Sequence, residues 1–346
     1  MEKTVRLKKI YFPAIRTAVL EECGEQDLNQ LPDNVVAIRT HISTVSCGTE
    51  LANILGKRIP SEKVGGADSF PRQCGYTGAG EVVAVGKGVT KVAPGDRVIY
   101  FWGKHQNYNL VTEDRVVRIL EGVSDSEAAL AFIASFSMAA IRKVKPETGE
   151  SSMVMGLGLL GQLATALLHA AGTVPVIAAD PIAERREEAL RNGADFALDP
   201  LTPDFAETVK RLTDGGVKAA IEVTGVGAGL NETLDCMAKF GRIALLGCTR
   251  DSNFTVDWYE KIHQPGITLV GAHTNARPKT ESSAGYFTHE EDMKCIMKLC
   301  RYGRLDLKRI VKETHSPQDA PEVYRRLMEE RNFPIGVQFD WHRLDG

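Results

Sequence analysis

The spacing of hydrophobic positions changes near residue 125. Before that point the apolar runs are short and bounded by turn residues, as at Val35–Ile38 and Arg97–Tyr100, which is typical of β-strands. After it, short apolar runs alternate with longer segments of helical period. Strands that alternate with helices predict a parallel sheet covered by helices on both faces. The pattern therefore predicts an α/β protein whose first part is mostly β.

The same pattern predicts individual elements. Helices are expected at residues 50–55, 126–144, 162–171, 183–192, 204–212, 230–240, 290–302 and 320–330. In the second half, strands are expected at 153–155, 219–223, 242–246, 267–270 and 336–339. The last helix and strand form a tail too short for a third domain, so we expect this tail to pack on the first domain.

One stretch joins a strand, a glycine-rich turn, a helix and a second strand that ends in an acid. The turn is Gly156-Leu-Gly158-Leu-Leu-Gly161, and Asp180 lies 19 residues after Gly161. Such glycines allow a tight turn, close approach of a pyrophosphate, and close packing of helix on sheet. The phosphates would lie at a helix N-terminus, and the carboxylate would bind a ribose hydroxyl. The stretch predicts dinucleotide binding; the alternative is a packing turn that binds nothing.

Composition narrows the class of protein. A chain of 346 residues with 43% hydrophobic and 25% charged residues is ordinary and globular, and its length favours two domains. A net charge of −3 without a basic block disfavours nucleic acid or an anionic membrane as a partner. We expect a cytoplasmic protein, since the longest apolar-like run is shorter than the roughly 20 residues that span a bilayer. The seven cysteines contain no Cys-x-x-Cys and do not indicate a disulfide framework.

Motifs along nearly the whole chain resemble those of the medium-chain dehydrogenase/reductase superfamily. They are Gly75-Tyr-Thr-Gly-Ala-Gly80, Pro94-Gly-Asp-Arg-Val98, the glycine turn and Asp180. The resemblance implies a GroES-like β-barrel catalytic domain (1–125), a Rossmann domain with a doubly wound parallel sheet (126–290) and a C-terminal return (291–346). It also implies reversible hydride transfer between an alcohol and NAD(P)⁺. Asp180 favours NAD over NADP, because a carboxylate there repels a 2′-phosphate.

The chain departs from this family at the zinc ligands. Zinc-dependent members carry a Cys, a Gly-His-Glu and a further Cys or Glu. Here Cys47 matches the first ligand, but Tyr76 replaces the histidine, and residues 131–137 contain neither Cys nor a carboxylate. Catalytic zinc takes three protein ligands and an open position, so one ligand is too few. The four-cysteine structural zinc lobe is also missing, and we expect no zinc.

Two zinc-free branches of the family remain. Gly75-Tyr76 together with His105-Gln106-Asn107 is similar to the subgroup of bacteriochlorophyllide-type dehydrogenases. Quinone-oxidoreductase-like members form the other branch, and they tend to use NADPH, which Asp180 disfavours.

Without a metal, another group must polarise the carbonyl and supply a proton. Thr49 lies where relatives relay the alcohol proton, or it caps a helix. Tyr76 could donate a hydrogen bond to the carbonyl or only fill the space of the missing ligand. His105 could shuttle a proton, since histidine titrates near neutral pH, or it could be structural. Cys47 and Glu50 are further candidates, with a buried thiol and a structural ion pair as their alternatives.

Other candidate residues come from the turn and from the ends of strands. For the cofactor they are Gly156, Gly158, Leu159, Leu160, Gly161, Asp180, Arg185, Thr224, Gly225, Gly247, Cys248, Ala272 and His273. For the substrate they are Asn275 and Arg277, in the polar and aromatic stretch 263–287, and Trp102 in the first domain. A surface loop or a dimer edge is the alternative for that stretch.

The sequence thus predicts a zinc-independent oxidoreductase that transfers a hydride between NAD(H) and a secondary alcohol or ketone. A sugar or polyol is the expected class of substrate. One alternative is an NADPH-linked reductase of enones or quinones, and another is a catalytically silent dinucleotide-binding protein. We also expect a homo-oligomer, either a dimer or a tetramer.

Overall fold

The chain forms two compact units. The computed structural model describes residues 4–57, 70–250 and 252–344. Unit 1 comprises residues 1–132, 297–302 and 307–346, and unit 2 comprises 133–296 and 303–306. The chain passes between the units inside two helices, α2 (Asp125–Val144) and α7 (His289–Arg301), and again at 302/303 and 306/307. The boundaries expected at 125/126 and 290/291 fall at the beginnings of these helices, so a helix rather than a linker joins the units at each place.

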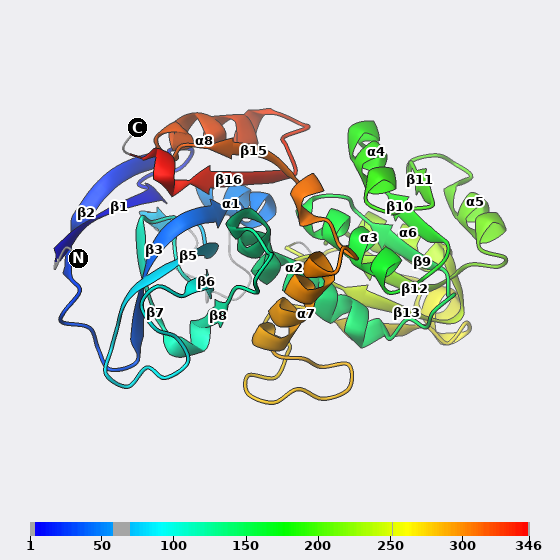
Figure 1. Cartoon of the computed structure of the whole chain (residues 1–346). Coiled ribbons are helices and arrows are strands. Elements are labelled where there is room, and N and C mark those ends of the chain that lie inside the picture. Colours follow the sequence, from blue (N-terminus) through cyan, green and yellow to red (C-terminus); the bar gives the residue numbers. More distant parts are fainter. Residues whose placement is uncertain (1–3, 58–69, 251, 345–346) are drawn as a thin grey trace. The chain divides into compact units, whose positions relative to one another are not determined.

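Unit 2 is built on a six-stranded parallel sheet covered by helices (Figure 1). The strand order β11-β10-β9-β12-β13-β14 is the 3-2-1-4-5-6 order of dinucleotide-binding sheets. The strands are β9 (Ser152–Met155), β10 (Val176–Ala179), β11 (Phe196–Leu198), β12 (Val217–Glu222), β13 (Met237–Leu245) and β14 (Thr268–Gly271). The helices are α3 (Leu159–Ala170), α4 (Ala183–Arg191), α5 (Phe205–Leu212) and α6 (Gly227–Asp235). The predicted Rossmann sheet is confirmed.

The central strands of this sheet are apolar on both faces. Every residue of β9 and of β10 is buried, which explains why these strands show no alternation in the sequence. Their side chains join one core with residues of α5 and β12, among them Phe205, Val209 and Ala220. No helix among the described residues is long and apolar enough to cross a membrane.

The helix predicted at 230–240 is wrong in its second half. Helix α6 ends at Asp235, and Met237 already pairs with Val217 of β12. The register shifts between Val217 and Ala219, and Phe240 takes a positive φ of 62° beside Gly241. Strand pairing therefore overrides the helical period of this segment. A short π-helix, η2 (Tyr259–His263), was not predicted either.

Unit 1 consists of two β-sheets and a few helices. A seven-stranded sheet has the order β15-β16-β3-β5-β6-β8, with β7 paired to β3, and a small sheet has the order β2-β1-β4. The strands are β1 (Thr4–Phe12), β2 (Val19–Asp27), β3 (Val35–Thr44), β4 (Arg72–Gln73), β5 (Thr77–Val85), β6 (Arg97–Phe101), β7 (Tyr108–Thr112), β8 (Val116–Arg118), β15 (Val311–His315) and β16 (Gly336–Asp340). The helices include α1 (Cys47–Ile54), α8 (Ala320–Glu329) and the short 3₁₀ helix η5 (Trp341–Arg343).

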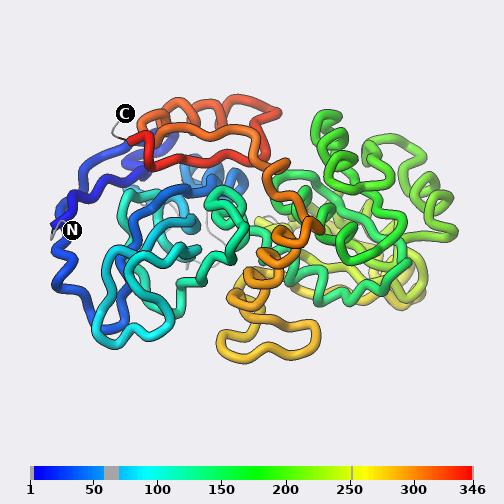
Figure 2. The backbone as a smooth tube through the Cα atoms, in the orientation of Figure 1, coloured from blue at the N-terminus to red at the C-terminus, as the bar shows by residue number. Residues whose placement is uncertain are grey.

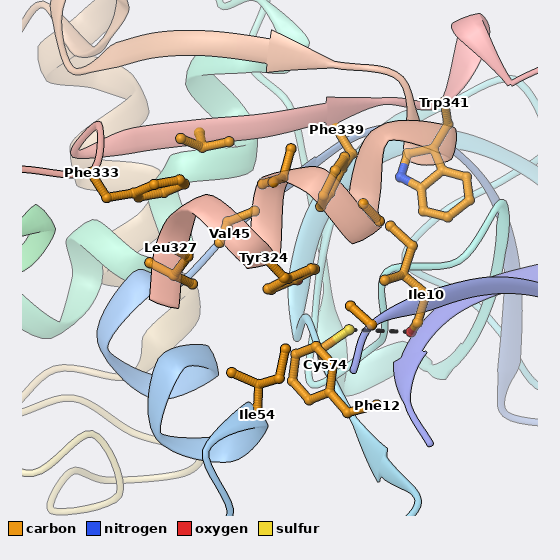
Figure 3. Close-up of a cluster of buried hydrophobic side chains, with 14 of the residues drawn as sticks. Ile10, Phe12, Val45, Ile54, Cys74, Tyr324, Leu327, Phe333, Phe339 and Trp341 are labelled. Carbon is orange, nitrogen blue, oxygen red and sulfur yellow. Dashed lines mark hydrogen bonds between the residues drawn. The ribbon is translucent and has the colours of Figure 1, made fainter. Parts of the chain in front are cut away.

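The C-terminal segment completes unit 1. Strand β16 pairs antiparallel with β3, and in Figure 2 the red C-terminal tube lies beside the blue N-terminal one. Helix α8 supplies Tyr324 to a core with Phe12 and Phe339, and the Phe12 and Tyr324 rings meet edge to face at 4.9 Å (Figure 3). This packing brings residues from both ends of the chain next to helix α1.

Candidate functional site

The glycine turn of unit 2 has the geometry of a phosphate cradle. Gly156 has a φ of 95°, and a Cβ built on Gly161 would lie 1.9 Å from the carbonyl oxygen of Gly156. The fold therefore requires glycine at both positions. Gly158 differs, because a Cβ there would meet nothing within 4 Å. Gly158 is also the N-cap of α3 and lacks a side-chain cap, so free N–H groups and open space coincide, as a pyrophosphate needs.

Asp180 is tied to this turn. It lies directly after β10 with its side chain almost fully buried, and its Oδ2 accepts a hydrogen bond of 2.8 Å from the backbone N–H of Leu157. Its Oδ1 accepts one of 2.8 Å from the N–H of Ile182. Each carboxylate oxygen can accept a further bond, which leaves capacity for ribose hydroxyls. The Arg185 guanidinium lies 3.8 Å from Oδ2.

The residues that follow β12 and β13 are in close contact beside the turn. A Cβ on Gly247 would lie 2.4 Å from the nitrogen of Gly225, and one on Gly225 would lie 2.6 Å from the Cys248 carbonyl oxygen. The side chain of Thr224 in turn limits the space at Gly156. The structure thus brings together the candidate residues Gly156, Thr224, Gly225, Gly247 and Cys248, at the sheet edge where such folds bind nucleotides.

The candidate residues in the loop after β14 differ in their exposure. Ala272 is buried, whereas His273 and Asn275 are exposed. The Arg277 side chain is held inside unit 2, where it donates to the Asp292 carboxylate at 3.1 Å and to the Ser135 carbonyl oxygen at 2.8 Å. Its Nε atom is buried and has no hydrogen-bond partner among the described residues. Arg277 therefore carries a structural role that its sequence position did not indicate.

Two alanine substitutions separate the roles of the glycines. Gly161→Ala is expected to lower the melting temperature markedly, because its Cβ collides with backbone. Gly158→Ala is expected to leave the melting temperature nearly unchanged and to weaken NADH binding, because its Cβ enters only the open space. Thermal denaturation and fluorescence titration with NADH test this pair. A Gly158→Ala variant that binds NADH normally would contradict the assignment of the cradle.

In unit 1, three hydroxyl groups meet at the beginning of α1. The Tyr76 hydroxyl donates to Ser46 Oγ at 2.7 Å, and Thr49 on the first turn of α1 lies close enough to lower the pKa of Tyr76. We call Ser46, Thr49 and Tyr76 the hydroxyl cluster. Burial raises the pKa of Tyr76 well above its usual value, and Ser46 and Thr49 partly offset this rise. Tyr76 is therefore a protonated donor at neutral pH.

Aromatic rings surround Tyr76. Its ring centroid lies 5.8 Å from that of Trp102 and 5.9 Å from that of Phe132, and Phe101 stacks on Phe132 at 4.7 Å. Trp102 is 39% exposed and has a positive φ of 55°, which is rare for a bulky residue. Such strained positions persist where the surroundings enforce them, and they cluster at ligand sites. Tyr76 and Trp102, both named from the sequence, thus lie side by side.

His105 and Glu50 belong to a buried network that also contains Ser43, Tyr324 and Trp341; we call it the Glu50 network. Glu50 Oε2 lies 3.2 Å from His105 Nε2 and accepts the Tyr324 hydroxyl, and Oε1 accepts the Ser46 backbone N–H at 2.8 Å. Burial alone would raise the pKa of Glu50. His105 and the hydrogen bonds lower this pKa by more than burial raises it, so the net pKa is below the usual value. Glu50 is therefore ionised.

The tautomer of His105 follows from its other neighbours. Ser43 Oγ accepts from Trp341 Nε1 at 2.9 Å and lies 2.7 Å from His105 Nδ1. Because an indole only donates, the Ser43 hydrogen is available for Nδ1, and Nε2–H then donates to Glu50. His105 is fully buried, and both ring nitrogens are engaged. It holds the Glu50 carboxylate rather than facing solvent.

The residues at the position of catalytic zinc do not suit that ion. The Cys47 sulfur lies 3.7–3.9 Å from the carbonyl oxygens of Val45, Pro334 and Ile335, which suit a protonated thiol rather than a thiolate ligand. Tyr76 donates to Ser46, and residue 131 is alanine. In the part of the chain that the structure describes, no three His, Cys, Asp or Glu side chains could hold a metal together.

Ser46 and Tyr324 were not identified from the sequence. Ser46 directly precedes Cys47 and is the N-cap of α1, so its position alone predicts an ordinary cap. Its hydroxyl does not cap the helix but accepts from Tyr76. Tyr324 lies 274 residues from Glu50, and no local pattern connects the two.

Comparisons with known proteins agree with this architecture. The model of an alcohol dehydrogenase GroES-like domain matches residues 32–130, and that of a zinc-binding dehydrogenase matches 160–287. The chain is 24% identical to D-guloside 3-dehydrogenase of Escherichia coli over 96% of its own length and 100% of that protein.

Solved structures show the same fold. A 2R,3R-butanediol dehydrogenase from Bacillus subtilis is 22% identical with a TM-score of 0.80, over 96% of this chain and 99% of that one. An alcohol dehydrogenase zinc-binding domain protein from Burkholderia ambifaria is 18% identical with a TM-score of 0.82, over 97% and 99%. With its GroES-like and Rossmann-like parts, the chain is an oxidoreductase that belongs to the medium-chain dehydrogenase/reductase superfamily.

Proposed function

We propose that this chain is a zinc-independent oxidoreductase that transfers a hydride between NAD(H) and a secondary alcohol or ketone of the sugar or polyol class. The hydroxyl cluster carries the proposal, because Tyr76 and its partner Ser46 take the place of a metal ligand and can bind a substrate oxygen by hydrogen bonds alone. This proposal also assigns the chain to the zinc-lacking subgroup similar to bacteriochlorophyllide-type dehydrogenases.

NADH, when bound, supplies the hydride. The glycine turn and Asp180 support its binding, with the strand-end residues and Arg185 as further contacts. Asp180→Asn is expected to weaken NADH binding by about 10-fold, the worth of one hydrogen bond to a charged group. It should also reduce the preference for NADH over NADPH. Parallel titrations with both cofactors measure this. If the wild-type chain prefers NADPH, the enone and quinone reductase alternative gains support.

The hydroxyl cluster is proposed to supply the proton that the substrate oxygen takes up. Donors aimed at the substrate oxygen stabilise the charge that develops there, and this is often the largest catalytic contribution. Tyr76 and Thr49 are the groups of this cluster predicted from the sequence. His105 and Glu50 act as positioning residues, since they fix the backbone at Ser46, and Cys47 supports the same segment.

The substrate class rests on the exposed indole of Trp102 and on the relative named for a D-guloside. An aromatic ring with a polar edge offers an apolar face to a sugar ring. Asn275 remains a proposed substrate contact, whereas the Arg277 side chain is held by Asp292 and Ser135. A panel of glycosides and polyols, assayed by reduction of NAD⁺, tests the proposal. Tight NADH binding without turnover of any of them would favour the catalytically silent alternative.

A homo-oligomer is also proposed. Strand β14 is the last in its sheet and has an open edge among the described strands. Trp258 and Tyr259 shortly before it, and Phe240, whose N–H donates to the Pro265 carbonyl oxygen, are more than half exposed. Open strand edges and exposed aromatic groups favour pairing between chains. Light scattering measures the mass in solution. A cytoplasmic location remains a prediction from the sequence.

A further inference from the structure

The hydroxyl of Ser46 is used in an unusual way. A serine at the N-cap normally accepts from a backbone N–H of the first turn, which is worth about 1 kcal/mol to the helix. Ser46 is the N-cap of α1, yet its side chain makes no such bond and accepts from Tyr76 instead. The Ser46 backbone N–H is held by Glu50, so the residue is fixed without its own cap.

The hydrogen of this hydroxyl is uncommitted. A phenol is more acidic than an alkyl hydroxyl, so the proton between the two oxygens lies on Tyr76 and points to Ser46. Ser46 Oγ–H has no acceptor among the described residues, although nine-tenths of the residue is buried. Thr49 meanwhile lies close enough to Tyr76 to lower the pKa of its hydroxyl. The hydrogen bond from Tyr76 therefore leads to a free donor at Ser46, and Thr49 lies beside Tyr76.

We propose that Ser46 is the catalytic group that gives the proton to the substrate oxygen, and that Tyr76 refills it. This inference rests on the proposed function. In reduction, the hydride adds to the carbonyl carbon, and the developing alkoxide takes the Ser46 proton. Ser46 Oγ takes the proton of Tyr76 at the same time, and the negative charge comes to rest on the phenolate, which Thr49 stabilises. Solvent then returns one proton to Tyr76, and oxidation runs through the same steps in reverse.

The order of the Ser46 and Tyr76 hydroxyls explains why both are needed. Burial raises the pKa of Tyr76, yet a tyrosine phenolate is still a weaker base than a serine alkoxide, so the negative charge is more stable on Tyr76 than on Ser46. A serine alone could donate a hydrogen bond but could not supply the proton. With Tyr76 behind it, Ser46 transfers a proton without ever carrying the charge.

Three variants and a proton inventory test the proposal with methyl D-guloside as substrate. Ser46→Ala is expected to lower kcat by about 100-fold, Ser46→Thr to retain most activity, and the exposed control Ser252→Ala to change nothing. Ser46→Ala removes no helix cap but takes the acceptor away from the buried Tyr76 hydroxyl, so a modestly lower melting temperature is expected, and unchanged NADH binding is the check that the variant is folded. In mixtures of H₂O and D₂O, two protons in flight give a curved dependence of kcat for the wild type, and Ser46→Ala should give a straight line.

A second readout needs no turnover. In protein labelled with 3-fluorotyrosine, the Tyr76 resonance is identified by its loss in Tyr76→Phe, and it should shift in Ser46→Ala but little in Ser46→Thr. A straight proton inventory for the wild type, or unchanged kcat in Ser46→Ala, would overturn the relay and leave the proposed function standing. A wild-type chain that binds NADH but oxidises no glycoside or polyol overturns both, whatever the resonance shows.

Discussion

Tyr76→Phe is expected to lower kcat/KM by about 10²- to 10⁴-fold, the range typical of a lost general acid. The substitution removes one oxygen and keeps the ring that contacts Trp102 and Phe132. The fold should therefore be unaffected, and NADH binding should match that of the wild type, since the glycine turn belongs to the other unit. Initial rates at saturating NAD⁺, with a fluorescence titration of NADH, measure both quantities.

A matched control makes this result specific. Tyr302 is 74% exposed, so Tyr302→Phe removes a hydroxyl of the same kind away from the hydroxyl cluster. This control should retain full activity. If Tyr76→Phe also retains it, Tyr76 only fills the space of a missing ligand, as the sequence had left open.

The second large effect concerns stability. His105→Leu is expected to lower the free energy of unfolding by about 1.5–3 kcal/mol, the range for a lost hydrogen bond to a charged group, here a buried carboxylate. The leucine fills most of the volume but leaves the Glu50 carboxylate without the donor at 3.2 Å. Urea denaturation measures the change, and His342→Leu, on a largely exposed side chain, should change it little.

A double substitution shows whether the charge is the cause. In the His105→Leu background, Glu50→Gln removes the uncompensated charge and should recover part of the lost stability. In the wild-type background the same substitution should be destabilising, because the carboxylate there is fully bonded. If Glu50→Gln lowers the free energy of unfolding by the same amount in both backgrounds, packing and not charge dominates at His105.

What the sequence could predict depends on how local the information is. The glycine turn and Asp180 lie within one stretch, and each has a separate steric or polar function, so their spacing predicts the strand–turn–helix–strand unit and the cradle. The helix over 230–240 was wrong in its second half because its helical period is local, whereas the pairing of Met237 with Val217 is not.

The site in unit 1 was only partly predictable for the same reason. Tyr76 and Thr49 stand out because they occupy positions of known chemistry in the family. The role of His105 depends on Ser43, Glu50 and Trp341, which lie far from it in the sequence. For Ser46 the local sequence is misleading, because its position predicts a helix cap. Only the geometry shows that its hydroxyl accepts from Tyr76.

The most direct test of the central claim is the zinc dependence of turnover. The protein is dialysed against a chelator, its metal content is measured by mass spectrometry, and its oxidation of the active glycoside or polyol with NAD⁺ is assayed before and after. The hydroxyl cluster predicts that kcat is unchanged while zinc stays far below one ion per chain. Activity that disappears with the metal and returns with added zinc would contradict it.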